Sequence, residues 1–100
     1  MSNPRGLGEQ ELRLLEAYSH CSWGMTPQQF YQKWDVTYEQ MAEICQRSRS
    51  TVQRWFGRGA VYRRPTAHDL QRLAVMDFLW EQWEMLPEGM RSGCMPWVNS

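Results

Sequence analysis

The sequence predicts an all-α fold, a compact bundle of about five helices. Three observations carry this prediction. Two threonine–glutamine capping boxes begin at Thr26 and Thr37, and an acidic version begins at Thr66. In a capping box, the threonine hydroxyl accepts a bond from the backbone amide three residues later, and the side chain at that later position accepts a bond from the threonine amide. No segment alternates polar and apolar residues over the length of a strand. The 100 residues suffice for one domain with a modest core and not for two.

The first predicted helix covers residues 9–21. Two glutamates stand in its first turn, where negative charge is favourable at the positive end of the helix dipole. Leu12, Leu15 and Tyr18 recur at helical spacing, and we therefore expect them to form the inner face of the helix. Residues 1–8 contain a proline and two glycines and are expected to form a flexible arm.

The next two predicted helices cover residues 27–34 and 38–45. Each follows one of the threonine–glutamine capping boxes. Pro27 occupies the first helical position, where its missing N–H group costs nothing. Gly24 is expected to end the turn that precedes these helices.

Two further helices are predicted over residues 49–56 and 67–86, so that the domain covers residues 9–86. Residues 87–100 contain two prolines and two glycines and are expected to form an irregular tail. Apolar side chains cover nearly the whole circumference of the last helix. They are Leu70, Leu73, Ala74, Val75, Met76, Phe78, Leu79, Trp80, Trp83, Met85 and Leu86.

Charge is unevenly distributed along the chain. Eleven basic and eleven acidic residues cancel, so the net charge indicates no particular partner. No acidic residue occurs between Glu43 and Asp69, however, and six of the eleven cations lie in that segment. They are Arg47, Arg49, Arg54, Arg58, Arg63 and Arg64.

Several classes of protein are excluded by what the sequence lacks. Three widely spaced cysteines with two histidines predict neither a metal site nor a disulfide framework. No phosphate loop, nucleophile motif or paired carboxylates appear, so we expect no enzymatic activity and no cofactor. His20 and Cys21 are adjacent, but neighbouring positions on a helix point in different directions. Without a signal peptide or an apolar membrane span, we expect a cytoplasmic protein that makes no membrane contact.

The segment of residues 38–59 combines two apolar stripes with a basic outer face. The stripes consist of Met41, Ala42 and Cys45 and of Val52, Trp55 and Phe56. Two short helices that meet at a sharp turn can bury both stripes together. Ala42 supports this arrangement, because only a small side chain fits where two helices cross closely.

The run MAEICQRSRSTVQRW within this segment resembles the helix-turn-helix DNA-binding motif, here at about residues 38–57. The resemblance implies that SRSTVQRW forms a recognition helix like those of bacterial repressors and of some recombinases. The sequence departs from the motif at the turn, where glycine and a small apolar residue are replaced by Gln46 and Arg47. A left-handed residue other than glycine costs about 1 kcal/mol. We therefore expect a turn of a different shape, with Arg47 pointing outward.

A wider resemblance covers most of the chain. The runs CSWGMTPQQFYQKWDVTYEQMAEIC and TVQRWFGRGAVYRRPTAHDLQRLAVMDFLWE are similar to the small single-domain helix-turn-helix proteins found in cyanobacteria. That family is known as predicted DNA binders without a clear biochemical role. The resemblance implies DNA binding and leaves the target sequence open.

The outward side chains of the predicted recognition helix suit DNA chemistry. Arginine bonds the two acceptors of guanine, glutamine pairs with adenine, and serine bonds bases or phosphates. The residues expected to read base edges are Arg49, Ser50, Gln53 and Arg54. The residues expected to contact phosphates are Tyr38, Arg47, Ser48, Arg58, Arg63 and Arg64. The expected function is sequence-specific binding of double-stranded DNA by a small transcription regulator.

The apolar last helix indicates a partner, because an ordinary surface helix keeps one polar side. We expect a homodimer, or another protein, to bind there. The interface residues are expected to be Val75, Phe78, Leu79, Trp83 and Leu86. Trp97 in the tail could dock on its own domain or on another protein. Two alternatives remain open: an accessory DNA-binding factor for recombination or plasmid maintenance, and a protein-interaction module whose basic face is incidental.

Overall fold

The computed structural model of the chain describes residues 4–20 and 23–93. These residues form six α-helices and two short 3₁₀-helices and contain no strand, which confirms the all-α class. The α-helices are α1 (Glu9–Ser19), α2 (Pro27–Lys33), α3 (Tyr38–Cys45), α4 (Arg49–Trp55), α5 (Ala67–Glu81) and α6 (Glu88–Arg91). The 3₁₀-helices are η1 (Gly59–Val61) and η2 (Trp83–Met85).

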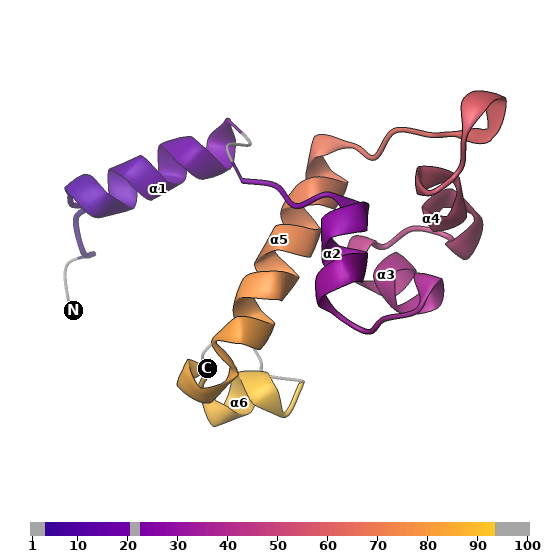
Figure 1. The fold of residues 1–100 in the computed structure, drawn as a ribbon. Helices are drawn as coiled ribbons and strands as arrows, with labels where there is room; N and C mark the ends of the chain where they lie inside the picture. The colour runs from indigo at the N-terminus through magenta and orange to yellow at the C-terminus, as the bar shows by residue number, and fades with distance from the viewer. Residues whose placement is uncertain (1–3, 21–22, 94–100) are drawn as a thin grey trace.

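Helices α2 to α5 form the packed body of the molecule (Figure 1). Helix α3 packs against both α4 and α5, and α2 packs against α5. One core lies between these helices and contains Phe30, Met41, Ala42, Cys45, Val52, Trp55 and Leu73. Both predicted apolar stripes of residues 38–59 therefore point into the same core, except for Phe56, which is half-buried at its margin.

The predicted helix starts are confirmed by their hydrogen bonds. The hydroxyl groups of Thr26 and Thr37 each accept a bond from the amide three residues later, at 3.0 and 3.1 Å. In both cases the side-chain oxygen of the glutamine at that third position accepts a bond from the threonine amide. Thr66 and Asp69 form the acidic version of the same capping box at the start of α5.

The expected inner face of the first helix is wrong. Leu12, Leu15 and Tyr18 are 52, 52 and 54% exposed, and α1 contains no buried residue. The reason is visible in Figure 1, where α1 extends from the body as an arm instead of lying along it. The leucine spacing does indicate an amphipathic helix, but this chain's own body does not cover its apolar face. Gly24 lies in the connection after the arm, and a Cβ atom there would stand 3.3 Å from the Cβ of Leu70.

The last predicted helix is shorter than expected and the tail is more regular. Helix α5 ends at Glu81, and the 3₁₀-helix η2 replaces its expected last turn. Leu86 is extended before Pro87, as expected from the steric effect of a proline ring on the preceding residue. Helix α6 then forms within the segment expected to be irregular, while Trp97 lies outside the described residues. No helix in the described part of the chain is long and apolar enough to cross a membrane.

Candidate nucleic-acid interface

The turn between α3 and α4 is left-handed, although the chain has no glycine there. Gln46 has φ 56° and ψ 47°. The Arg47 amide donates to the Ala42 carbonyl at 2.9 Å, and the Gln46 amide donates to the Glu43 carbonyl at 3.3 Å, which is the bond pattern of a Schellman motif. The expectation of a differently shaped turn is therefore wrong: the backbone accepts a strain of about 1 kcal/mol at Gln46.

Arg47 holds the turn against the start of α5. Its Nε atom donates to Asp69 Oδ1 at 2.8 Å, and its terminal nitrogen reaches the Thr66 hydroxyl at 3.3 Å. Burial by itself raises the pKa of the Asp69 carboxyl, but the hydrogen bonds from Arg47 and Thr66 outweigh it and hold the pKa below its usual range. The Arg47 guanidinium, expected at a phosphate, is thus bound to a buried carboxylate within the domain.

The inner face of α4 is fixed by the core. Val52 and Trp55 are 0 and 1% exposed. The Gln28 side chain from α2 donates to the Trp55 carbonyl at 3.0 Å and thereby satisfies an acceptor at the end of α4. Cys45, on α3, is buried beneath the turn, and burial raises the pKa of its thiol to about 12, with the nearby Asp69 carboxylate adding to the effect.

The outer face of α4 is polar and exposed. The four predicted base-reading residues, Arg49, Ser50, Gln53 and Arg54, are all on it. Arg49 donates to Glu39 Oε2 at 3.0 Å and to Gln53 Oε1 at 3.3 Å. Ser48 is the N-cap of α4, and its hydroxyl accepts from the Thr51 amide at 3.2 Å. One side of α4 therefore presents a row of hydrogen-bond donors and acceptors, while the buried Val52 and Trp55 are on the other side.

An aromatic cluster lies beside Arg49 on this face of α4. Tyr38 and Phe56 are stacked with their ring centroids 4.9 Å apart, and Tyr31 packs against both. The Arg49 guanidinium lies 5.9 Å from the centre of the Tyr38 ring, a cation–π distance. Tyr31 and Glu39 are neighbours of α4 that the sequence does not predict, because both come from other helices and no local pattern pairs them with α4.

The segment after α4 folds back along that helix. The Arg63 amide donates to the Arg54 carbonyl at 3.1 Å, which also accepts from the Gly57 amide at 3.1 Å. Gly59 adopts φ 61°, a left-handed conformation that favours glycine. A shallow cavity of about 440 Å³ opens here beside Gln53 and Arg54.

The arginines of this region divide into paired and unpaired sets. Arg47 pairs with Asp69 and Arg49 pairs with Glu39. Within the described residues, no carboxylate pairs with the other four predicted DNA-contacting arginines, and all four are exposed. They are Arg54, Arg58, Arg63 and Arg64. The positive potential of the region therefore comes from the end of α4 and the segment that follows it.

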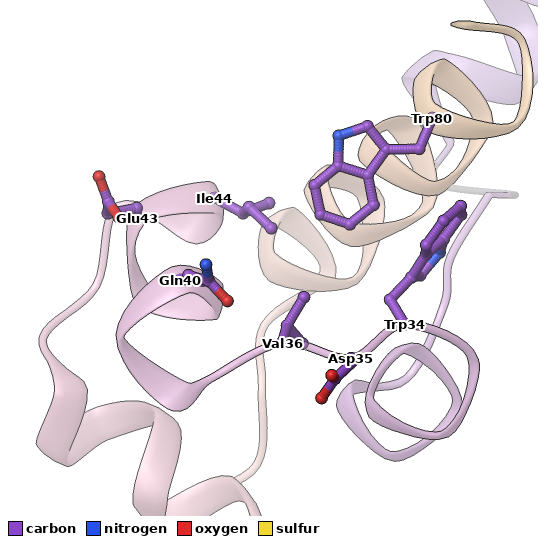
Figure 2. A pocket seen from close by; sticks show the side chains of 7 residues that line it. All are labelled: Trp34, Asp35, Val36, Gln40, Glu43, Ile44 and Trp80. Atoms are coloured by element: carbon purple, nitrogen blue, oxygen red, sulfur yellow. The ribbon is translucent and has the colours of Figure 1, made fainter.

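A second surface, between α2, α3 and α5, has the opposite character. Figure 2 shows a groove in which Trp34 and Trp80 lie near Val36 and Ile44, with the carboxylates of Asp35 and Glu43 at its margin. The Trp34 indole donates to Asp77 at 2.9 Å, and Lys33 pairs with the same carboxylate. Two carboxylates at its margin would repel phosphate, so this groove does not extend the basic surface.

No group of histidine, cysteine or carboxylate side chains in the described residues could hold a metal ion. No family model, characterised protein or solved structure matches the chain. Its function is therefore inferred from the residues and their arrangement.

Proposed function

We propose that α3, the turn and α4 form a helix-turn-helix that binds double-stranded DNA with sequence specificity, and that the protein is a small transcription regulator. One observation carries the proposal: α4 is anchored by two almost fully buried residues while its opposite face exposes only hydrogen-bonding side chains. A helix that enters the major groove needs this combination, because its position must be fixed and its free face must meet base edges.

Roles follow from position on α4. Arg49, Ser50, Gln53 and Arg54 share the free face and are proposed to contact bases. Arg49 is held beside Gln53 by Glu39 and the Tyr38 ring, so its guanidinium is already extended along the face before DNA arrives.

Phosphate contacts are proposed for residues at the margins of the motif. Arg58, Arg63 and Arg64 supply unpaired positive charge, while Ser48 and Tyr38 mark the N-terminal ends of α4 and α3. Arg47 is assigned a supporting role, since its guanidinium already binds Asp69.

Selection of the protein's preferred duplex from a random pool, followed by affinity measurements on alanine variants, tests the proposal. Arg49→Ala, Gln53→Ala and Arg54→Ala should each weaken the selected duplex by about 1–3 kcal/mol and a scrambled duplex much less. Gln32→Ala is the matched control, because Gln32 is exposed on α2. Trp55→Ala should unfold the motif, since loss of a buried aromatic costs about 3–5 kcal/mol. Equal losses on both duplexes would reduce the three residues to phosphate contacts.

Two other functions remain distinguishable by one experiment. Genomic fragments retained by the purified protein should be promoters if it regulates transcription, and ends of mobile or plasmid elements if it is an accessory recombination or maintenance factor. No enrichment would favour a protein-interaction module. The apolar face of α5 supports a homodimer in any of these roles, and we propose that Val75, Phe78 and Leu79 belong to its interface.

A further inference from the structure

Exposed large apolar side chains are concentrated on the arm α1 and on the segment formed by α5 and η2. Eleven large hydrophobic residues are exposed in the described chain, and eight of them lie on or beside α1, on α5, or in η2. They are Leu7, Leu12, Leu14, Leu15, Tyr18, Phe78, Trp83 and Met85. A monomer rarely exposes so large an apolar surface without a binding role.

Helix α1 is an amphipathic helix, and within the described residues none of its side chains is buried. At 100° per residue, its leucines and Tyr18 fall within one side together with Glu11 in the first turn, and Glu9, Arg13 and Glu16 fall on the other. Its links to the body are at its C-terminal end, where the Tyr18 ring packs edge-on against Trp23 and the Tyr18 carbonyl accepts from Gln71 at 3.4 Å. An 11-residue helix is marginal in water by itself, so this arm needs a further contact to be stable.

The outer face of α5 offers a matching surface. Leu73 points into the core, and the apolar residues on the opposite side of the helix are Ala74, Val75, Phe78 and Leu79. A cavity of about 360 Å³ lies between this face and the arm, lined by Leu14, Trp23, Ala74, Val75 and Phe78. Figure 1 shows α1 and α5 diverging from that point, so the arm of one chain covers little of its own α5.

We propose that a second copy of this chain covers both surfaces, with α1 of each copy docked along the outer face of α5 of the other. The two surfaces are on the same chain, so a two-fold pairing buries both at once. Five of the exposed side chains, Leu12, Leu14, Leu15, Tyr18 and Phe78, are on these two helices and are 52–61% exposed. At on the order of 100 Å² each, the pairing buries on the order of 500 Å² per copy, or about 1,000 Å² in total, which is the lower limit for a specific interface.

Charge favours the same pairing. Helix α1 carries Glu9, Glu11 and Glu16 against one arginine, and Arg72 is on the edge of the α5 face. The α5 carboxylates Asp77 and Glu81 pair with Lys33 of α2. The pairing therefore brings an acidic arm beside Arg72, and opposite charges attract. The pairing also leaves α4 accessible, because α4 lies on the other side of α5 from the arm (Figure 1). This pairing is the homodimer of the proposed regulator, and we expect it to form without DNA.

Sedimentation equilibrium of the full-length protein in reductant and without DNA tests the pairing. The wild type should be a dimer at 20 µM, and Leu12→Gln with Leu15→Gln should raise the dissociation constant at least tenfold. Arg13→Gln, on the polar side of the same helix, should not raise it, because this change keeps the apolar side intact and makes α1 more acidic. Far-ultraviolet circular dichroism and a melting curve confirm that each variant is folded. A monomeric wild type, or a folded dimer insensitive to the leucine substitutions, would overturn the proposal.

Cross-linking tests the reciprocal geometry. Leu15→Cys and Phe78→Cys are placed in separate chains in which Cys21 and Cys94 are replaced by serine, and the two proteins are mixed and oxidised. The proposal requires a disulfide dimer that contains one copy of each variant, identified by mass. Dimers formed equally by either variant alone would mean that copies pair through some other surface and would refute the arm-to-α5 contact. Both outcomes are independent of DNA affinity, so they leave the DNA-binding proposal to its own test.

Discussion

Asp69→Asn tests whether one buried carboxylate holds the turn before α4 to the start of α5. The Asp69 side chain is 3% exposed and accepts bonds from Arg47 Nε at 2.8 Å, from the Thr66 amide at 2.8 Å and from the Thr66 hydroxyl at 2.9 Å. Asparagine has the same shape and keeps one acceptor oxygen. If that oxygen stays on the Thr66 amide, the new NH₂ group faces the Arg47 guanidinium, donor against donor.

The expected loss of stability follows from these contacts. Hydrogen bonds to a charged group contribute about 1.5–3 kcal/mol each in buried sites. Arg47 is 38% exposed, so water weakens its share of the interaction, and the capping bond at Thr66 survives the change. We therefore expect Asp69→Asn to lower the free energy of unfolding by about 2 kcal/mol at pH 7. For a chain of this size that corresponds to a fall in Tm of about 10 °C.

The loss should depend on pH with a definite sign. The folded-state pKa of Asp69 is lowered, so the charged carboxylate stabilises the fold above the unfolded pKa of about 3.9, and this stability is lost as pH falls through the folded pKa. The gap between wild type and variant should thus be full at pH 7 and should close in strong acid, where protonated aspartic acid resembles asparagine. Asp77 also has a lowered pKa, because the bonds from Lys33 and Trp34 outweigh the effect of burial, but it is present in both proteins and cancels.

Urea titrations of both proteins between pH 7 and pH 2.5 measure the gap. Thr66→Ser is the matched control, since it keeps the capping hydroxyl and should show the wild-type pH dependence. A gap that stays constant over this range, or a variant as stable as the wild type at pH 7, would show that the Asp69 charge does not hold the turn.

Three smaller predictions concern the same part of the chain. Gln46→Gly should stabilise the fold by up to about 1 kcal/mol in urea titrations by removing left-handed strain, whereas Gln46→Val should destabilise it; the opposite order would contradict the turn geometry. Replacing Arg63 and Arg64 by alanine should weaken all duplexes alike and flatten the slope of log affinity against log salt by up to about 2, and an unchanged slope would remove them from the interface. Cys45 should resist alkylation at pH 8 until urea unfolds the protein, because burial raises its pKa to about 12; rapid labelling of Cys45 in the native protein, located by peptide mass to separate it from Cys21 and Cys94, would contradict its burial.

Local signals in the sequence predicted most of the body. Each threonine capping box begins a helix at the expected residue, because a cap depends only on side chains three positions apart. The buried faces of α3 and α4 were also predictable, since Met41 and Cys45 recur at helical spacing in α3 and Val52 and Trp55 do so in α4. The same reasoning placed the candidate base-reading residues on the exposed side of α4.

Features that depend on distant residues were not predictable. Periodicity indicated that α1 has an apolar face, but it could not indicate that the body leaves that face uncovered. Arg47 is expected to point outward, but its guanidinium is bound to the carboxylate of Asp69. Asp69 is 22 residues away in the chain, so no local pattern indicates this pair. The stack of Tyr38 on Phe56 likewise joins the start of one helix to the end of the next, and no spacing rule connects those positions.

The contacts of Asp69 fix the position of the turn between α3 and α4. A left-handed glutamine is strained, and strain of this kind persists where the surrounding structure fixes the backbone on both sides. On one side the turn continues into α3, whose last residue, Cys45, is buried, and on the other Arg47 is bound to Asp69 in the first turn of α5. The start of α4 is thereby fixed to the start of α5.

In the proposed dimer α5 also binds the second copy, so this link sets the separation of the two α4 helices, which must be about 34 Å to enter successive major grooves. A loose link would leave each α4 able to bind DNA while removing any preference for the distance between half-sites, and a bidentate pair with a buried carboxylate is suited to prevent that.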